Sequence, residues 1–141
     1  MKRTLIPALL FLPISLLAVE PEEVIEDFFD NLDAGSYSRA IDYFFTGNKR
    51  MTPGHLETMK RNLDGHLGTL GQCFGEDRIK KEFHTDYFRT YTYLVRYEKE
   101  LVFVQLLFYK PKDRWVGYNL VVHGDEKQIL EYMYRLKIAE G

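Results

Sequence analysis

The stretch VIEDFFDNLDAGSYSRAIDYFF, residues 24–45, decides how the chain begins to fold. Its first half repeats apolar residues at helical spacing and predicts a helix that ends near Gly35. Its second half repeats this pattern after Ser36, the expected N-cap. The stretch therefore predicts a helical hairpin in which two aromatic pairs face a common core: Phe28, Phe29, Phe44 and Phe45.

Further along the chain the pattern changes from helical to extended. Thr52 and Pro53 signal the start of a third helix. From residue 73 the chain is rich in Tyr, Phe, Val and Thr, and recurring turn signals predict strands near residues 74–83, 87–98, 101–110 and 114–123. Their short loops predict consecutive antiparallel hairpins. We therefore expect an α+β fold, with three N-terminal helices packed on a four-stranded antiparallel meander sheet and a short C-terminal helix over residues 126–137.

The first 18 residues differ in character from the rest. Two basic residues precede an apolar run from Leu5 to Leu17, and Ala18 stands before the acidic stretch VEPEE. This is the pattern of a signal peptide, and two prolines make the run a poor permanent membrane span. We expect residues 1–18 to be removed and residues 19–141 to form a single exported domain, periplasmic or secreted, without stable membrane insertion. An uncleaved membrane tether is the alternative.

Composition excludes several partners and chemistries. The aromatic content of 15% predicts an interior built from large flat side chains. Without residues 1–18 the chain has 17 basic and 21 acidic residues, and its basic residues are not clustered, so we expect no nucleic-acid partner. The four histidines lack the spacing of a metal site, and we expect no metal and no cofactor. Cys73, the single cysteine, is expected to be a small buried side chain, with an intermolecular disulfide as the alternative.

The order of elements resembles the nuclear transport factor 2-like (NTF2-like) superfamily, which has a cone-shaped, cystatin-like α+β fold. Residues 24–44 are similar to the first two helices of many members. Residues 93–120, YLVRYEKELVFVQLLFYKPKDRWVGYNL, are similar to small exported bacterial members. The resemblance implies a strongly curved sheet that forms a cone with the helices. It implies no single activity, because the superfamily includes isomerases, dehydratases and binding proteins without catalysis.

The sequence contains no recognisable catalytic motif. The enzymatic alternative that the resemblance implies is a small lyase or isomerase, which would use a histidine or carboxylate base with tyrosine hydroxyls. His66, expected on the apolar side of the third helix, and Tyr91 are the candidates. A partly buried histidine bonded to backbone or water is the other interpretation of His66. No carboxylate occurs from Leu101 to Tyr109 or from Trp115 to Val122, so neither of these strands carries a base.

A binding site can be placed on the sheet by pairing its strands. If the third hairpin turns at residues 111–113, Gln105 falls opposite Asn119 among apolar neighbours, as in many small-molecule sites. The alternative is that these amides bond to each other on an outward or dimer-forming face. Arg96 would meet an anionic ligand or be solvated. The expected ligand-binding residues are Gln105, Asn119, Tyr93, Arg96 and Trp115.

These observations favour an exported, non-catalytic module with an aromatic-lined, cone-shaped cavity. Its expected partner is a small apolar or aromatic ligand, or another protein. A homodimer is compatible with this reading, because the second face of an aromatic sheet has to be covered or to tolerate water.

Overall fold

The computed structural model describes residues 19–140, so the predicted signal peptide lies outside the described residues. The elements in chain order are α1 (Pro21–Asp33), α2 (Tyr37–Phe44), α3 (Pro53–Leu67), β1 (Cys73–Thr85), β2 (Phe88–Tyr97), β3 (Leu101–Tyr109), β4 (Val116–His123) and α4 (Glu126–Glu140). The predicted α+β class, the four-stranded antiparallel meander and its order β1-β2-β3-β4 are confirmed. No helix over the described range is long and apolar enough to cross a membrane.

Local signals explain where the helices begin and end. Gly35 follows α1 with a φ of 70°, a conformation that glycine adopts without the strain of a Cβ. The Thr52 hydroxyl accepts a hydrogen bond from the His55 amide at the start of α3. Ser36 stands at the N-cap position of α2, but its hydroxyl makes no capping bond. The first connection is therefore set by Gly35 rather than by Ser36.

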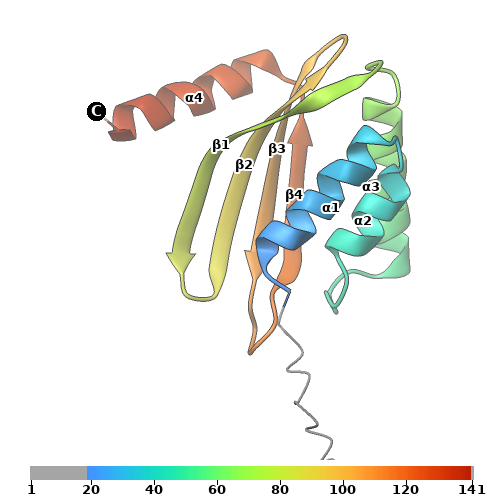
Figure 1. Ribbon diagram of the computed structural model, residues 1–141, viewed down its shortest axis with the longest axis vertical. Coiled ribbons are helices and arrows are strands. Elements are labelled where there is room, and N and C mark those ends of the chain that lie inside the picture. Colours follow the sequence, from blue (N-terminus) through green and yellow to red (C-terminus); the bar gives the residue numbers. More distant parts are fainter. Residues whose placement is uncertain (1–18, 141) are drawn as a thin grey trace, which may run out of the picture.

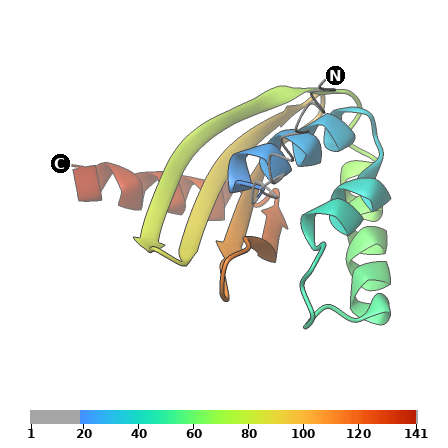
Figure 2. The same ribbon diagram turned by 60° about the horizontal axis from the view of Figure 1, so that its bottom comes forward.

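The two faces of the sheet are covered by different helices. Figure 2 shows strands β1 and β2 arching over α1, and α4 lies on the opposite side. The inner face, towards α1–α3, carries buried side chains such as Tyr93, Val104 and Phe108. The outer face carries the alternate residues, among them Thr92 and Gln105. Alternation along the strands therefore assigns each residue to one of the two surfaces.

An aromatic cluster fills the space between the helices and the inner face. Neighbouring rings meet edge to face, for example Phe44 against Phe108 at 5.3 Å and Phe29 against Tyr93 at 4.7 Å between centroids. Phe28 and Phe108 have no exposed surface, and Phe44 is 1% exposed. The cluster joins α1, α2, β2 and β3 through seven rings: Phe28, Phe29, Phe44, Phe45, Tyr91, Tyr93 and Phe108.

The third hairpin differs from the expected register. Its last pair is Tyr109 with Val116, and a register shift between Leu107 and Phe108 moves the rest, so that Asn119 pairs with Leu107 and not with Gln105. Gly117 lies at this irregularity, and a Cβ there would overlap the carbonyl oxygen of Phe44. The expected opposition of the two amides was therefore wrong, because the hairpin closes at Tyr109 and Val116 and β4 has one extra residue, Tyr118, at the irregularity.

The C-terminal helix is longer than expected. It has 15 residues, against the short helix that the sequence predicts. It leaves the end of β4 and crosses the outer face (Figure 1), where Ile129 is buried and the Tyr132 ring meets Phe103 at 5.0 Å. Only the first part of α4 is therefore held against the sheet.

Candidate functional site

Aromatic and cationic side chains gather on the inner face beside the N-terminal end of α1. Phe83 of β1 pairs with Arg89 of β2, so both side chains lie on the same face. The Arg89 guanidinium lies 4.3 Å from the centroid of the Phe83 ring and 4.4 Å from that of Trp115, which precedes β4. Lys81 lies 4.9 Å from the Phe83 ring, and Lys110 lies 5.5 Å from the Trp115 ring. We call these five residues the aromatic–cation cluster.

Two aromatic rings hold the Arg89 guanidinium in place. A cation over an aromatic face is attracted by the ring quadrupole, and the guanidinium lies within 4.5 Å of both ring centroids. Glu20, just before α1, lies 3.4 Å from one of these nitrogens and is itself largely exposed. Because exposed ion pairs are weak, this carboxylate is a replaceable partner for Arg89.

A tyrosine and a carboxylate meet beside the cluster. The buried Tyr91 donates its hydroxyl hydrogen bond to Glu22 on α1 at 2.9 Å, and Lys81 lies 2.7 Å from the same oxygen. Partial burial pushes the pKa of Glu22 upward, but hydrogen bonds from Lys81, from its own backbone and from Tyr91 outweigh it, so the pKa is lowered. Burial, helped by Glu22, raises the pKa of Tyr91 well above its ordinary value. At neutral pH the carboxylate is therefore ionised and the phenol keeps its proton.

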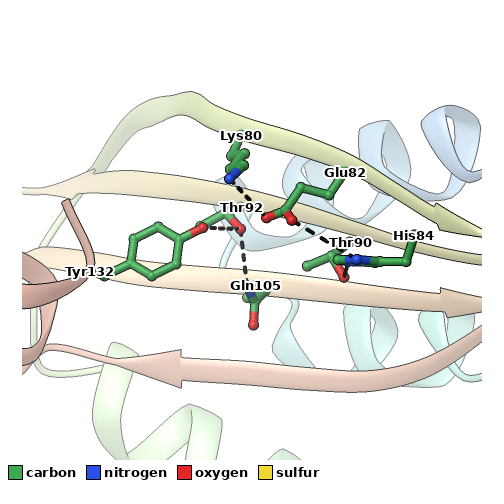
Figure 3. A network of polar contacts seen from close by, with 7 residues as sticks. All are labelled: Lys80, Glu82, His84, Thr90, Thr92, Gln105 and Tyr132. Atoms are coloured by element: carbon green, nitrogen blue, oxygen red, sulfur yellow. Dashed lines mark hydrogen bonds and ion pairs between the residues drawn. The ribbon is translucent and has the colours of Figure 1, made fainter. Parts of the chain in front are cut away.

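A second set of hydrogen-bonded polar side chains lies on the outer face (Figure 3). The Thr92 side chain has no exposed surface, and its hydroxyl oxygen bonds to Gln105 at 3.1 Å and to Tyr132 of α4 at 3.2 Å. Thr90 on the same strand bonds to a ring nitrogen of His84 at 2.9 Å. The Tyr132 bond attaches α4 to the sheet and, with the Gln105 bond, pairs the buried Thr92 hydroxyl.

The predicted ligand-binding residues do not lie together. Tyr93 is buried on the inner face, whereas Arg96 is exposed on the outer face and pairs with Asp77 at 3.1 Å. Gln105 and Asn119 also lie on the outer face, but they do not bond to each other: Gln105 donates to Thr92, and Asn119 accepts from the Leu120 amide. Trp115 belongs to the aromatic–cation cluster.

The catalytic candidates also lie apart. His66 is exposed on α3, between the buried Leu63 and Leu67, so its expected position on the apolar side of the helix was wrong. The reason is that buried leucines take the single face that α3 turns to the core. Tyr91 does meet a helix-borne carboxylate, Glu22. The lyase or isomerase alternative therefore loses His66 and keeps only the Tyr91–Glu22 pair.

Two hollows of the described surface lie on the helical side. One, of about 430 Å³, is lined by residues of α1 and α2 that include Asp27, Arg39 and Tyr43. The other, of about 350 Å³, lies between α2 and α3 and includes Lys60 and Asp64. Both are open to solvent and contain no stacked cation. Over residues 19–140, no group of three or more His, Cys, Asp or Glu side chains is placed to hold a metal ion.

Sequence reasoning missed four of the five cluster residues. Lys81 and Phe83 alternate onto the inner face of β1, and this alternation was readable. Which residues of β2 they face could not be read from the sequence, because β1 has three register shifts, one of them between Phe83 and Thr85. A regular hairpin closed by Thr85 and Phe88 would set Phe83 opposite Thr90 instead of Arg89. The shift therefore creates the stacked arginine.

Among solved structures, the chain is similar to the crystal structure of a Campylobacter jejuni protein provisionally described as an NTF2-like transpeptidase. The TM-score is 0.51 at 10% sequence identity, over 70% of this chain and 97% of that chain. No protein-family model matches the sequence, and no curated protein does. The expected NTF2-like fold is therefore confirmed. At this identity the likeness concerns the fold alone.

Proposed function

We propose that the protein is an exported, non-catalytic binding module, and that the aromatic–cation cluster binds a small ligand with an aromatic ring and an acidic group. The observation that carries this proposal is the Arg89 guanidinium stacked between Phe83 and Trp115. Export is supported by the signal-peptide pattern of residues 1–18.

The chemistry of the cluster selects the ligand class. Arg89 presents a flat fork of donors that matches the two oxygens of a carboxylate or the oxygens of a phosphate. Lys110 adds positive charge beside Trp115, whereas the charge of Lys81 is already paired with Glu22 at 2.7 Å. Phe83 is 59% exposed, so part of its surface is open to a ligand. An aromatic acid would place its ring on this surface and its acid group on Arg89, displacing the exposed Glu20.

The enzymatic alternative has less support. A proton acceptor works best when its pKa lies near the working pH, and the pKa of Glu22 is shifted away from neutrality by its hydrogen bonds. Tyr91 could donate a hydrogen bond to a ligand, but Glu22 already accepts that hydrogen. The pair is better suited to holding α1 against the sheet than to proton transfer.

Trp115 is the single tryptophan, so its fluorescence reports on the cluster directly. We would titrate the purified protein with benzoate, phenyl phosphate and the uncharged benzyl alcohol. The two acids should change the emission of Trp115 at concentrations where the alcohol does not. Arg89→Gln should weaken binding of the acids by about 10-fold or more, because a hydrogen bond to a charged group contributes about 1.5–3 kcal/mol.

Arg96→Gln is the matched control, because Arg96 is an exposed arginine of the same strand on the opposite face. It should leave the titration unchanged. An equal loss in both variants, or an unchanged affinity in Arg89→Gln, would reject the cluster as the site. A saturable response to benzyl alcohol alone would show that the site is apolar and reject the role of Arg89.

A further inference from the structure

A register shift at the start of β1 turns a carboxylate toward the helices. Cys73 pairs with Tyr97 of β2, and after the shift Glu76 pairs with Val95. Both partners lie on the inner face, so the two β1 side chains lie there as well, although regular alternation over three residues would put them on opposite faces. Gly75, with a φ of 120°, allows this turn of the backbone. The partly buried Glu76 therefore faces the helical side of the sheet.

The end of α1 brings two more carboxylates to the same region. Figures 1 and 2 both show the end of α1 beside the start of β1. Asp30 and Asp33 lie one turn apart at this end, and the last turn of α1 has no basic residue. Burial, and then Asp33 and Asp30, raise the pKa of Glu76. The three carboxylates therefore repel one another, and we call them the acidic cluster.

No described side chain neutralises the acidic cluster. The ion pairs within residues 19–140 include none of its members. Arg78 follows Glu76 on the inner face but forms no ion pair with it, and Asp77 pairs with Arg96 on the outer face. The C-terminal end of a helix also carries partial negative charge, which opposes carboxylates in its last turn. A bound cation would offset both effects.

A buried hydroxyl without a partner faces the acidic cluster. Tyr97 is 7% exposed, and its hydroxyl oxygen is enclosed without a hydrogen-bond partner in the described part of the chain. Burial, and then Cys73, Tyr37 and Asp33, raise the pKa of this hydroxyl, so it lies beside Asp33. Buried polar groups in native proteins nearly always have partners. A ligand with an N–H donor would supply the missing one.

We propose that the acidic cluster and the Tyr97 hydroxyl bind the ammonium group of a small primary alkylamine. An ammonium group carries three N–H donors and no acceptor, so the hydroxyl oxygen can accept one of its hydrogens and carboxylates the others. A metal ion fits less well, because no three acidic, histidine or cysteine side chains within residues 19–140 are placed to share one. The ring of the partly buried Tyr37 offers a surface for the alkyl chain.

This site is separate from the aromatic–cation cluster. Asp30 and Asp33 belong to the last turn of α1, whereas Glu20 and Glu22, which contact the aromatic–cation cluster, lie at its start. The two sites also have opposite charge preferences. An amine should therefore bind without changing the fluorescence of Trp115, and the two proposals can fail independently.

Amide NMR of the isotope-labelled protein tests the site. We would titrate n-butylammonium chloride at an ionic strength held constant with sodium chloride. Amides near Asp33, Glu76 and Tyr97 should shift and reach saturation, whereas the uncharged 1-butanol should leave them in place. Shifts that do not saturate, or that 1-butanol reproduces, would overturn the proposal. Saturation of the same amides by calcium chloride at lower concentration would show a metal site and overturn the amine.

Removing one charge at a time tests the acidic cluster. Asp33→Asn and Glu76→Gln should each raise the Kd for n-butylammonium by about 10-fold or more, because each weakens a hydrogen bond between charged groups. Glu82→Gln is the matched control, because Glu82 lies on the outer face of the same strand beside Lys80. It should leave the Kd unchanged. An equal loss in the control, or an unchanged Kd in both cluster variants, would reject this site.

Tyr97→Phe separates binding from folding. The hydroxyl has no partner in the described chain, so its removal should not lower the Tm. With amine bound it accepts a hydrogen bond from a charged donor, so the Kd for n-butylammonium should rise by about 10-fold. A lower Tm with an unchanged Kd would show that the hydroxyl serves the fold alone, and would overturn its place in the site.

Discussion

Cys73 is held in its neutral form by its surroundings. The side chain is half-buried where β1 begins, and burial, together with Asp33, raises the pKa of its thiol from 9.0 to about 11. Thiolate is the reactive form of cysteine, so little of it is present at neutral pH. This favours the expected unpaired side chain over an intermolecular disulfide.

Alkylation measures this effect. At pH 8, iodoacetamide should modify Cys73 about 100-fold more slowly in the native protein than in urea, as two pKa units of difference in thiolate fraction imply. The folded pKa is raised, so the thiol's contribution to stability is present below about pH 9 and is lost as the pH rises through 11. Equal rates in the native and unfolded protein would show that the thiol is neither buried nor perturbed.

At the scale of elements, two glycines should respond in opposite ways to one substitution. Gly117 of β4 lies against the backbone of α2, where an added Cβ would overlap the Phe44 carbonyl oxygen. Gly65 lies exposed within α3, and a Cβ there would meet nothing within 4 Å. Gly117→Ala should lower the free energy of unfolding by about 1–3 kcal/mol. Gly65→Ala should raise it by up to about 1 kcal/mol.

Urea denaturation of both variants gives the comparison. The two changes add the same methyl group, so opposite signs would show that the close approach of β4 to α2 decides the effect at Gly117. If Gly117→Ala proved as stable as the parent protein, the strand would have to lie farther from the helix than it does here.

The elements themselves were largely predictable, because each rests on local signals. Thr52 and Pro53 mark the start of α3, and the chemistry of the Gly35 turn ends α1. The register of the strands was not predictable to the same degree. Four register shifts, three in β1 and one in β4, each displace the pairing by a residue. Gly75 and Gly117 mark two of them, and no glycine marks the other two.

At the scale of the whole molecule, the aromatic cluster joins the helices to the sheet. Phe44 and Phe108 come from the two layers and meet at 5.3 Å. Phe44→Ala should lower the free energy of unfolding by about 3–5 kcal/mol, a large part of the stability of a domain this size. Tyr43→Ala, at the exposed neighbouring position, is the control and should cost far less.

A double-mutant cycle measures the interaction free energy between Phe44 and Phe108 apart from their contacts with other residues. Phe44→Leu and Phe108→Leu, singly and together, should show a coupling of about 0.5–1.5 kcal/mol beyond the lost buried area. A coupling near zero would mean that the two layers are joined by burial alone, without a specific contribution from ring geometry.

The candidate site was less predictable than the fold for a physical reason. The periodicity of the first two helices was enough to place Phe28, Phe29, Phe44 and Phe45 in the core. The cluster around Arg89 instead depends on residues from β1, β2 and the β3–β4 loop, which meet only after bulges set the pairing. Trp115 was predicted to be a binding residue from an expected place beside Gln105 and Asn119, and its actual neighbours in the cluster were not predicted.

The filled interior has a kinetic consequence. A ligand that binds in an enclosed site can enter or leave only after a lid or a loop has moved. Here Phe83, Arg89 and Trp115 lie at the outside of a closely packed body, and Phe83 is open to solvent. We therefore expect the proposed ligand to associate on encounter, without a preceding opening step, and differences in affinity between such ligands to arise chiefly from their rates of release.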